Sequence, residues 1–324
     1  MPISIGCVLF NYENGGLQPS GGYDFGPLRA ALAASPRRPD LIFFCEAKRY
    51  ADNGGNGLLH AAKAISDQFD APYIGLLGYM ERGPMPPAIF YNPAVLTQLP
   101  PWYGHGSHHD YHDQRNVARF AVRGTAAGGE PDVEFLAGVD HWEPLSGPVR
   151  ELAARRWGRY GRKGKLPAIL AGDTNATPSG PHFAARDWAL AAELDWTNAS
   201  HKGREQDGTW VADTAAMDHL IGRWVDGHGR VGGAGFSSLA ELAWQMSMDC
   251  PAAARPGLLG SDGRILPTVN DEVDVGGGLH IDNVIANDLM LRHVDPGTFQ
   301  IHVPPPGVRY SDHRAVSWEL RIGR

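Results

Sequence analysis

Apolar runs of strand length recur along the chain, and polar or glycine-rich segments separate them. Several of these runs are apolar almost throughout, which is typical of strands that are covered on both faces. The pattern predicts strands at residues 3–10, 41–45, 88–91, 117–122, 133–139, 168–171, 281–286 and 315–322.

Helical patterns lie between these runs, and each follows a side chain that can cap the first backbone N–H groups of a helix. The pairs of cap and predicted helix are Asp24 with residues 25–34, Asn56 with residues 57–69, and Ser238 with residues 239–248. Strands and helices mixed in this order favour an α/β protein in which two sheets pack face to face with helices outside.

The length of the chain and its less regular part bear on domain organisation. A large two-sheet α/β domain can accommodate 324 residues, so we expect a single domain over residues 1–324. Residues 200–280 are richer in glycine and aspartate and less periodic, which indicates long loops around one helix. Long loops in a compact domain are often functional, so we expect this region to form a rim that selects the substrate.

Polar side chains stand where the predicted strands end. Carboxylates, carboxamides and imidazoles follow the earlier runs and precede the last one. In chain order these residues are Asn11, Glu13, Glu46, Asp140, His141, Asp173, Asn175, Asp282, Ser311, Asp312 and His313. Because ligands bind where strand ends converge in layered α/β proteins, we interpret this set as a candidate active site.

Each of these residues, taken alone, also has a structural interpretation. A Gly-Asp pair after a strand, such as Gly172 and Asp173, is typical of a turn in which the Asp bonds its own backbone. Glu46 alone fits a solvated residue at a strand end, and His141 alone fits a hydrogen-bonded structural histidine. The joint pattern is what favours a site.

Six motifs give the chain a family resemblance: LFNYEN, PDLIFFCE, GVDHWEP, LAGDTN, HIDNVIAN and YSDHR. In type and order they resemble the signatures of the endonuclease/exonuclease/phosphatase superfamily, the group of pancreatic-type DNases, apurinic-site endonucleases, sphingomyelinases and inositol polyphosphate phosphatases. The resemblance runs from Ile3 to Ile322, and GDTN with a late ID and a terminal SDH is its specific part. It implies a four-layer α/β sandwich with metal-dependent phosphoesterase activity.

The resemblance implies a metal side of the site. Asn11 and Glu13 are similar to the pair that anchors it, with Glu13 where relatives often have Asp. Glu46 resembles the principal metal carboxylate, and Asp312 resembles a further one. Mg²⁺ prefers oxygen ligands and takes one or two carboxylates together with substrate phosphate and waters, so we expect Mg²⁺, or Mn²⁺ in its place, as the cofactor.

The resemblance also implies a catalytic side. Asp173 and Asn175 resemble the pair that aligns the attacking water and binds phosphate or a second metal. His313 resembles the imidazole beside the scissile phosphate, oriented by Asp282. Since an aspartate fixes the tautomer of a histidine and favours its protonated form, such a histidine can donate to phosphate or take a proton from water. His141 resembles the second histidine of the DNase-like and phosphatase branches.

The residue that orients His141 is open. In DNase-like relatives a glutamate near the strand at residues 88–91 does so, but this neighbourhood reads ERGPMPPAIFYNP. Glu81 is one candidate, and a backbone carbonyl group is the other.

Two features precede the predicted strand at residues 117–122. Arg115 resembles a basic residue that reaches the phosphate in similar proteins, and arginine is suited to bidentate phosphate binding. A histidine-rich segment, HGSHHDYHD, is interpreted either as a zinc site or as a loop at the substrate-contacting rim. Its histidines are His105, His108, His109 and His112.

Charge and cysteine content narrow the function further. The formal net charge of −7 disfavours a protein that coats nucleic acid over many phosphates, but it allows a nuclease that grips a few phosphates beside a metal. The basic stretch at residues 150–165 is interpreted as a solvated helix face and the loop after it. Two of the three cysteines, Cys7 and Cys45 but not Cys250, lie in apolar runs, so buried reduced thiols are expected.

The chain has no stretch of about 18 apolar residues, and its first residues lack a basic region followed by an apolar one. We therefore expect a soluble, cytoplasmic protein with no membrane insertion.

Together these features predict a divalent-metal-dependent phosphoester hydrolase that uses in-line attack by a metal- and Asp/His-activated water. The first interpretation is a phosphodiesterase or nuclease, and the alternative is a phosphatase or phosphodiesterase acting on a small metabolite or phospholipid head group. A third is a non-catalytic binding protein of the same fold. The expected partner is a phosphoester substrate, either nucleic acid or a small phosphorylated molecule, and no obligate protein partner is evident.

The shape of the binding surface separates the first two interpretations. A wide basic groove flanked by stacking aromatic side chains would favour nucleic acid. A closed pocket lined by Trp210, Trp224 or Trp244 would favour a small molecule.

Overall fold

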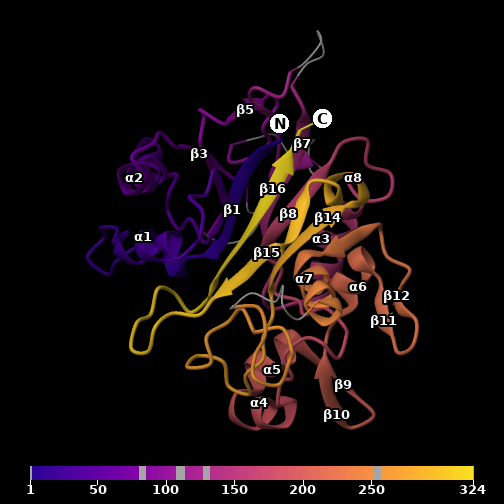
Figure 1. Ribbon diagram of the computed structural model, residues 1–324. Helices are drawn as coiled ribbons and strands as arrows, with labels where there is room; N and C mark the ends of the chain where they lie inside the picture. Colours follow the sequence, from indigo (N-terminus) through magenta and orange to yellow (C-terminus); the bar gives the residue numbers. More distant parts are fainter. Residues whose placement is uncertain (1, 80–84, 107–113, 127–131, 251–256, 324) are drawn as a thin grey trace.

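The computed structural model describes residues 2–79, 85–106, 114–126, 132–250 and 257–323. Within these residues, two six-stranded mixed sheets pack face to face, with helices on their outer faces (Figure 1). This arrangement confirms the predicted α/β sandwich.

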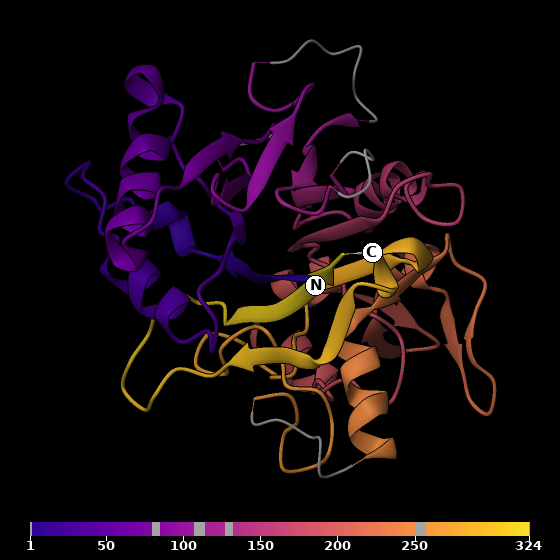
Figure 2. The same cartoon turned by 45° about the horizontal axis from the view of Figure 1, so that its top comes forward.

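The first sheet has the strand order β15-β16-β1-β2-β4-β3. β1 runs parallel to β2 and antiparallel to β16. Because Ile3 pairs with Ile322, the two ends of the chain lie side by side, as Figures 1 and 2 both show. The strands are β1 (Ile3–Asn11), β2 (Leu41–Cys45), β3 (Ile74–Leu77), β4 (Ala88–Tyr91), β15 (Val294–His302) and β16 (Ala315–Ile322).

The second sheet has the order β13-β14-β8-β7-β6-β5. β7 and β8 are parallel, and β14 runs antiparallel to β8. These central strands bring the sequence motifs GVDHWEP, LAGDTN and HIDNVIAN next to one another. The strands are β5 (Leu96–Leu99), β6 (Val117–Val122), β7 (Glu134–His141), β8 (Ala168–Asp173), β13 (Phe236–Ser238) and β14 (Asp282–Asn287).

Successive side chains on the strands alternate between two apolar layers. In β1, Ile5, Cys7 and Leu9 face the core between the sheets, whereas Val8 and Phe10 pack against the outer helices. Both faces of the strand are therefore buried, which explains why its sequence is almost continuously apolar.

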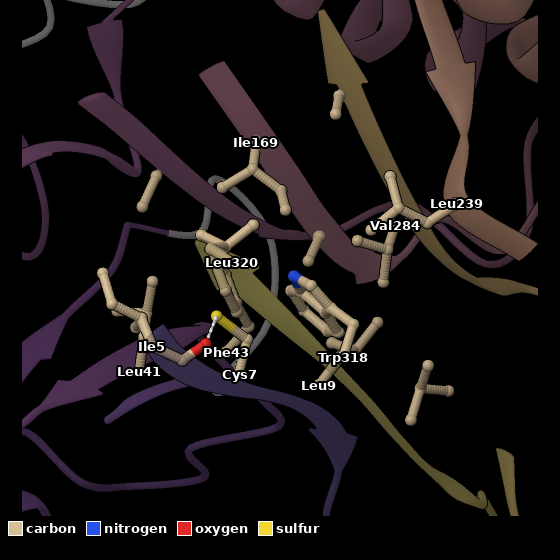
Figure 3. Packing of buried hydrophobic residues seen from close by; sticks show 14 of the residues in the cluster. Ile5, Cys7, Leu9, Leu41, Phe43, Ile169, Leu239, Val284, Trp318 and Leu320 are labelled. Atoms are coloured by element: carbon tan, nitrogen blue, oxygen red, sulfur yellow. Dashed lines mark hydrogen bonds between the residues drawn. The ribbon is translucent and has the colours of Figure 1, made fainter. Parts of the chain in front are cut away.

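Figure 3 shows the layer between the sheets. Leu9, Phe43 and Trp318 of the first sheet share one core with Ile169 and Val284 of the second. The rings of Phe43 and Trp318 stack with their centroids 5.6 Å apart. Burial of each such side chain stabilises the fold by about 1.5–3 kcal/mol, so this layer holds the two sheets together.

Helices cover the outer faces of both sheets. α1 (Gly26–Ala33) and α2 (Asp52–Phe69) pack on the first sheet, and α3 (Gly147–Gly158) and α6 (Ala215–Ile221) pack on the second. α7 (Leu239–Asp249) packs against strands of both sheets, and its predicted cap is confirmed because the side chain of Ser238 accepts from the backbone N–H of Glu241. The remaining helices are η1 (Glu13–Gly16), α4 (Trp188–Leu194), α5 (Trp196–Lys202) and α8 (Asp288–Leu291).

Residues 200–280 hold more regular structure than the sequence predicts. Besides α7, they contain α6, the edge strand β13 and two hairpins. The prediction of long loops around one helix is therefore wrong here, because strands of three or four residues are too short to show a hydrophobic period. The hairpin strands are β9 (Gly203–Gln206), β10 (Thr209–Ala212), β11 (Arg223–Val225) and β12 (Gly229–Val231).

The basic segment contains α3, as predicted, but its charges are not all solvated. Arg150 is 1% exposed, and its guanidinium donates to Asp213 Oδ2 at 3.1 Å and to the His201 carbonyl oxygen at 2.7 Å. The interpretation as a solvated face is wrong for Arg150, whereas Arg155 on the same helix is exposed.

The cysteine prediction holds for the two strand residues. Cys7 and Cys45 are buried free thiols, and Cys250 is exposed. Among the helices of the described residues, none has the length and apolar character needed to cross a bilayer.

Candidate active site

The polar residues of the candidate site continue the inward positions of their strands. After the apolar residues that face the core, the last inward-facing residue is Asn11 in β1, His141 in β7 and Asp173 in β8. In β14 the first residue, Asp282, faces inward, because it stands two residues before the inward-facing Val284. In the second sheet, Asp173 pairs directly with both His141 and Asp282. The alternation that fills the core with apolar side chains therefore also gathers these polar ones at one end of the gap between the sheets.

Asp173 lies at the centre of this group. Its Oδ2 accepts a hydrogen bond from Asn11 Nδ2 at 3.0 Å, which links the two sheets. The same oxygen lies 3.6 Å from His141 Nε2 and 3.8 Å from His313 Nε2. Burial alone would raise the pKa of Asp173, but the charges of His313, His141 and Lys202 outweigh burial and hold this pKa below its ordinary value. Asp173 is therefore an ionised acceptor.

His313 and Asp282 form a buried pair, with Nδ1 of the imidazole 2.7 Å from Oδ2 of the carboxylate. Burial alone would lower the pKa of His313, but the negative charges of Asp282 and Asp173 outweigh burial and raise it well above its ordinary value. The pair is thus an imidazolium and a carboxylate, and Nε2 of His313 is a charged donor near Asp173 and Asn11.

His141 turns its Nε2 toward Asp173, and its Nδ1 is buried without a hydrogen-bond partner among the described residues. Glu81 lies outside those residues, and no backbone carbonyl within them accepts from Nδ1. The backbone of His141 is held by Asp140, whose Oδ1 accepts from the His141 N–H at 3.0 Å and from Asn116 Nδ2 at 3.3 Å. Asn116 is a supporting residue that the sequence did not indicate.

Asn11 and Glu46 present oxygen atoms that fit a divalent cation. Glu46 Oε1 accepts from Asn11 Nδ2 at 3.3 Å, and Oε2 accepts from the backbone N–H of Asn14 at 2.8 Å. Asn11 Oδ1 is buried and has no hydrogen-bond partner in the described part of the chain. A buried carbonyl oxygen beside a carboxylate is a donor set that Mg²⁺ prefers, so the expected cofactor fits here.

The backbone of Glu46 has a φ of +66°, in the left-handed region that residues other than glycine rarely adopt. This conformation ends β2 and takes Glu46 out of the simple alternation of the strand. Strained residues of this kind concentrate at functional sites, which agrees with a functional side chain at this position.

A second set of atoms could also hold a metal. Ligand atoms of Asp173, Asp282 and His313 all lie within 4.8 Å of one another. Because Nδ1 of His313 already bonds Asp282 and the imidazole is protonated, His313 itself becomes a metal ligand only after it loses a proton, which leaves two carboxylates in this set. We therefore favour Asn11 and Glu46 as the cation-binding side.

Two predicted metal residues lie toward the edge of the cluster. Glu13 is half exposed, and its Oε2 accepts from Arg309 Nη2 at 2.8 Å. The side chain of Asp312 accepts from Ser311 Oγ at 2.9 Å and adds to the negative charge around His313. Glu13 is thus turned toward Arg309, while Asp312 remains close to His313.

Arg115 precedes Asn116 in the chain, and only part of the histidine-rich segment belongs to the described residues. The guanidinium of Arg115 is buried, 3.9 Å from the ring centroid of Tyr79. His105 is exposed. The other histidines of that segment, His108, His109 and His112, lie outside the described residues.

Lys202 is a site residue that the sequence did not indicate. It ends α5, is 9% exposed, and its Nζ donates to Asn175 Oδ1 and, at 3.4 Å, to the Pro144 carbonyl oxygen. Burial lowers the pKa of Lys202 to about 8, although the charge of Asp173 opposes this shift. Because Lys202 stands in a polar stretch outside the long strands, only the folded chain shows that it meets Asn175.

The side chain of Asn175 is fixed at both ends of its amide group. Nδ2 donates to the Trp142 carbonyl oxygen at 3.0 Å, Oδ1 accepts from Lys202, and the backbone N–H donates to Asp173 Oδ1 at 2.9 Å. Because an ammonium group only donates and a carbonyl oxygen only accepts, the orientation of the amide follows from these partners. One N–H group of Nδ2 is therefore taken by Trp142, and the second N–H group is the donor that the side chain can offer to a ligand.

Comparison with known proteins gives similarity in structure but not in sequence. No family model and no curated protein sequence matches the chain. An endonuclease/exonuclease/phosphatase protein from Bacteroides vulgatus is similar with a TM-score of 0.55 and 13% identity over 99% of both chains. Humanized D. rerio TDP2 gives 0.52 and 14% identity, covering 98% of this chain and 99% of that one.

An AP endonuclease from Archaeoglobus fulgidus gives a TM-score of 0.52 and 12% identity, covering 98% of this chain and 100% of that one. At such low identity the likeness concerns the fold, and it extends over almost the whole chain. The chain therefore has the fold of the endonuclease/exonuclease/phosphatase superfamily, as its motifs predict.

Proposed function

We propose that this protein is a divalent-metal-dependent phosphoester hydrolase, and that its main activity is on phosphodiesters, including those of nucleic acid. The observation that carries the proposal is the meeting of Asn11, Asp173 and His313 within 3.0–3.8 Å at the converging strand ends. One similar structure is named an AP endonuclease and another, from Neisseria with a TM-score of 0.53, a 3′ phosphatase. Proteins of this fold thus include enzymes for phosphoester bonds of different kinds.

The charges of the site suit hydrolysis by in-line attack. Phosphoester hydrolysis requires neutralisation of the phosphate oxygens and a water aligned opposite the leaving group. A bound Mg²⁺ or Mn²⁺ would supply positive charge beside Glu46 and Asn11. His313, kept protonated by Asp282, donates from Nε2 to a phosphate oxygen. Asp173, kept ionised by the surrounding cations, accepts from the attacking water and orients it.

Lys202 acts in this proposal as a positioning residue. Lys202 donates to Oδ1 of Asn175, and this hydrogen bond keeps the amide in the orientation in which Nδ2 faces the Trp142 carbonyl oxygen. Asn175 then donates to a phosphate oxygen, and Asp173 alone accepts from the water. This arrangement separates two roles that the resemblance assigns jointly to Asp173 and Asn175.

A second candidate function is hydrolysis of a small phosphorylated molecule. The net charge of −7 favours it, because a long polyanion is repelled by a negatively charged protein more strongly than a small one.

A hydrolysis screen tests the proposal. The protein is incubated with Mg²⁺ or Mn²⁺ and with plasmid, single-stranded DNA, RNA, inositol phosphates, nucleotides and bis(4-nitrophenyl) phosphate. We expect hydrolysis of a diester that EDTA abolishes and added metal restores, with His313→Ala as the control for contaminating activity. Absence of hydrolysis on every substrate with both metals, or equal activity in the His313→Ala protein, contradicts the proposed function.

A further inference from the structure

A groove of about 710 Å³ is lined in part by residues that stand close to candidate site residues in the sequence. Its lining includes Thr177, two residues after Asn175, and Arg204, two residues after Lys202. Three of the chain segments that shape the site therefore continue into the groove walls, the third being the segment through Leu279 that leads into β14.

Positive side chains dominate the described lining of this groove. The charged lining residues are Arg186, Arg204, Arg223, Arg264 and Asp218. Arg186 is neutralised by an ion pair with Asp274. The other three arginines come from different elements, namely β9, β11 and the loop after residue 257, so their convergence is a product of the fold.

Carboxylates do little to cancel these three charges. Arg264 has Asp262 only at 3.9 Å, and both side chains are exposed. Arg204 Nη2 donates to the neutral Gln206 Oε1 at 3.4 Å, and neither Arg204 nor Arg223 forms an ion pair with a carboxylate of the described residues. Asp218 is already bound by hydroxyl groups, since it accepts from Ser179 Oγ at 2.6 Å and from Thr214 Oγ1 at 2.7 Å.

We propose that Arg204, Arg223 and Arg264 bind a second phosphate group of the substrate, so that this enzyme selects molecules carrying two phosphates. The inference rests on the proposed function, because the first phosphate is the one held at Asp173 and His313. Guanidinium groups match phosphate oxygens in pairs, which makes arginine the suitable residue. In a chain with a net charge of −7, a positive groove cannot follow from an overall excess of basic residues.

The second phosphate has two sources with the same chemistry: the next phosphate along a nucleic acid strand, or another phosphate on a small molecule. Two pairs of probes distinguish them. One pair is the thymidine dinucleotide with and without a 5′-phosphate, and the other is inositol 1,4-bisphosphate and inositol 1-phosphate. Bis(4-nitrophenyl) phosphate, which has a single phosphate, reports on the catalytic site alone.

The test compares a groove variant with a charge-matched control. The groove variant carries Arg204→Gln, Arg223→Gln and Arg264→Gln. The control carries glutamine at three exposed arginines on other elements, namely Arg29, Arg123 and Arg292. Binding of each probe is measured by calorimetry in EDTA, so that no turnover occurs, and turnover is measured separately with Mg²⁺ or Mn²⁺.

In the wild-type protein and the control, the second phosphate should lower Kd for one probe pair by about tenfold or more, as expected for charge-assisted hydrogen bonds. The groove variant should lose this gain and still turn over bis(4-nitrophenyl) phosphate at the wild-type rate. The probe pair that shows this gain in affinity identifies the source of the second phosphate.

A gain in affinity that is absent from both probe pairs in the wild-type protein, or that survives in the groove variant, overturns the inference. Failure of the wild-type protein to hydrolyse any probe contradicts only the proposed function, since the binding measurement stands without turnover.

Discussion

The hydrogen bond of 2.7 Å between His313 and Asp282 allows a test of mechanism at single residues. Asp282→Asn should leave an imidazole that is less often protonated, and turnover should fall by about 10² to 10⁴, the range for loss of a positioned acid or base. His313→Ala should cost at least as much. Because residues that act as one unit are not additive, the double variant should be little worse than His313→Ala alone.

The pH profile gives an independent check on this pair. Asp282 raises the pKa of His313, so the limb of the profile that reports loss of the His313 proton should move to lower pH in Asp282→Asn. If the two losses multiply in the double variant and the limb does not move, the residues act separately and Asp282 does not orient His313.

The proposed positioning role of Lys202 can be tested through turnover and its dependence on pH. Lys202→Met removes the donor that fixes Asn175, and turnover should fall by about 10- to 100-fold, as expected when a group that contacts substrate is misplaced. Above pH 8 the wild-type protein loses the Lys202 proton, so its turnover should decline there. The variant should lack this alkaline limb, and unchanged turnover with an unchanged profile would refute the positioning role.

The unfolding free energy should show the same titration with a known sign. The pKa of Lys202 is about 8 in the folded protein and about 10.4 in the unfolded chain, so the folded state gives up this proton first. The contribution of Lys202 to stability therefore increases as pH rises from 8 toward 10, and Lys202→Met should remove that increase without loss of stability at pH 7. Denaturant titrations across this pH range measure it.

At the scale of elements, α3 combines a buried arginine with exposed ones. Arg150→Met leaves Asp213 without its buried partner and should lower the unfolding free energy by about 3 kcal/mol, the magnitude for a broken buried pair. Replacing the exposed Arg155 and Arg159 by glutamine should change stability by less than about 0.5 kcal/mol and leave activity on small substrates unaltered. A large loss of activity on polynucleotides in that second variant, with a weaker salt dependence, would instead show that the C-terminal end of α3 and the residue after it bind nucleic acid.

The strands that the sequence predicts are the eight interior strands of the two sheets, and those that it misses are the four edges, β15, β3, β13 and β5. Interior strands are covered by a sheet and by helices, so their sequences are apolar throughout. Edge strands carry exposed positions, for example Ile74 in β3, which is 44% exposed, and their pattern is weaker for that reason.

The same physical distinction applies to the candidate site. Asn11, His141 and Asp173 could be found from the sequence because each is a polar residue at the last inward-facing position of a buried strand. Lys202 and the groove arginines could not be found in this way, since Lys202 ends a short helix, Arg204 and Arg223 lie in hairpins and Arg264 lies in a loop. The packing of these short segments is fixed only in the folded chain.

For the whole molecule, we propose that the two sheets close around a cation-dependent phosphoesterase site. The side chain of Asn11 in the first sheet donates a hydrogen bond to Asp173 in the second. Glu46 lies beside Asn11, and the Oδ1 atom of Asn11 is buried. If this oxygen set binds the metal, removal of one charge from it should weaken metal binding while the fold is retained, because the core between the sheets is untouched.

The most direct measurement is a titration of bis(4-nitrophenyl) phosphate turnover with Mg²⁺ and Mn²⁺ in the wild-type protein and in Glu46→Gln, which keeps the shape of the side chain. Glu134→Gln is the matched control, because Glu134 pairs with Arg119 at the opposite end of β7. We expect Glu46→Gln to need about tenfold more metal, or a larger excess, with reduced maximal turnover and an unchanged unfolding midpoint, since proteins bind Mg²⁺ through only one or two carboxylates. Wild-type turnover and an unchanged metal titration in Glu46→Gln would contradict this proposal.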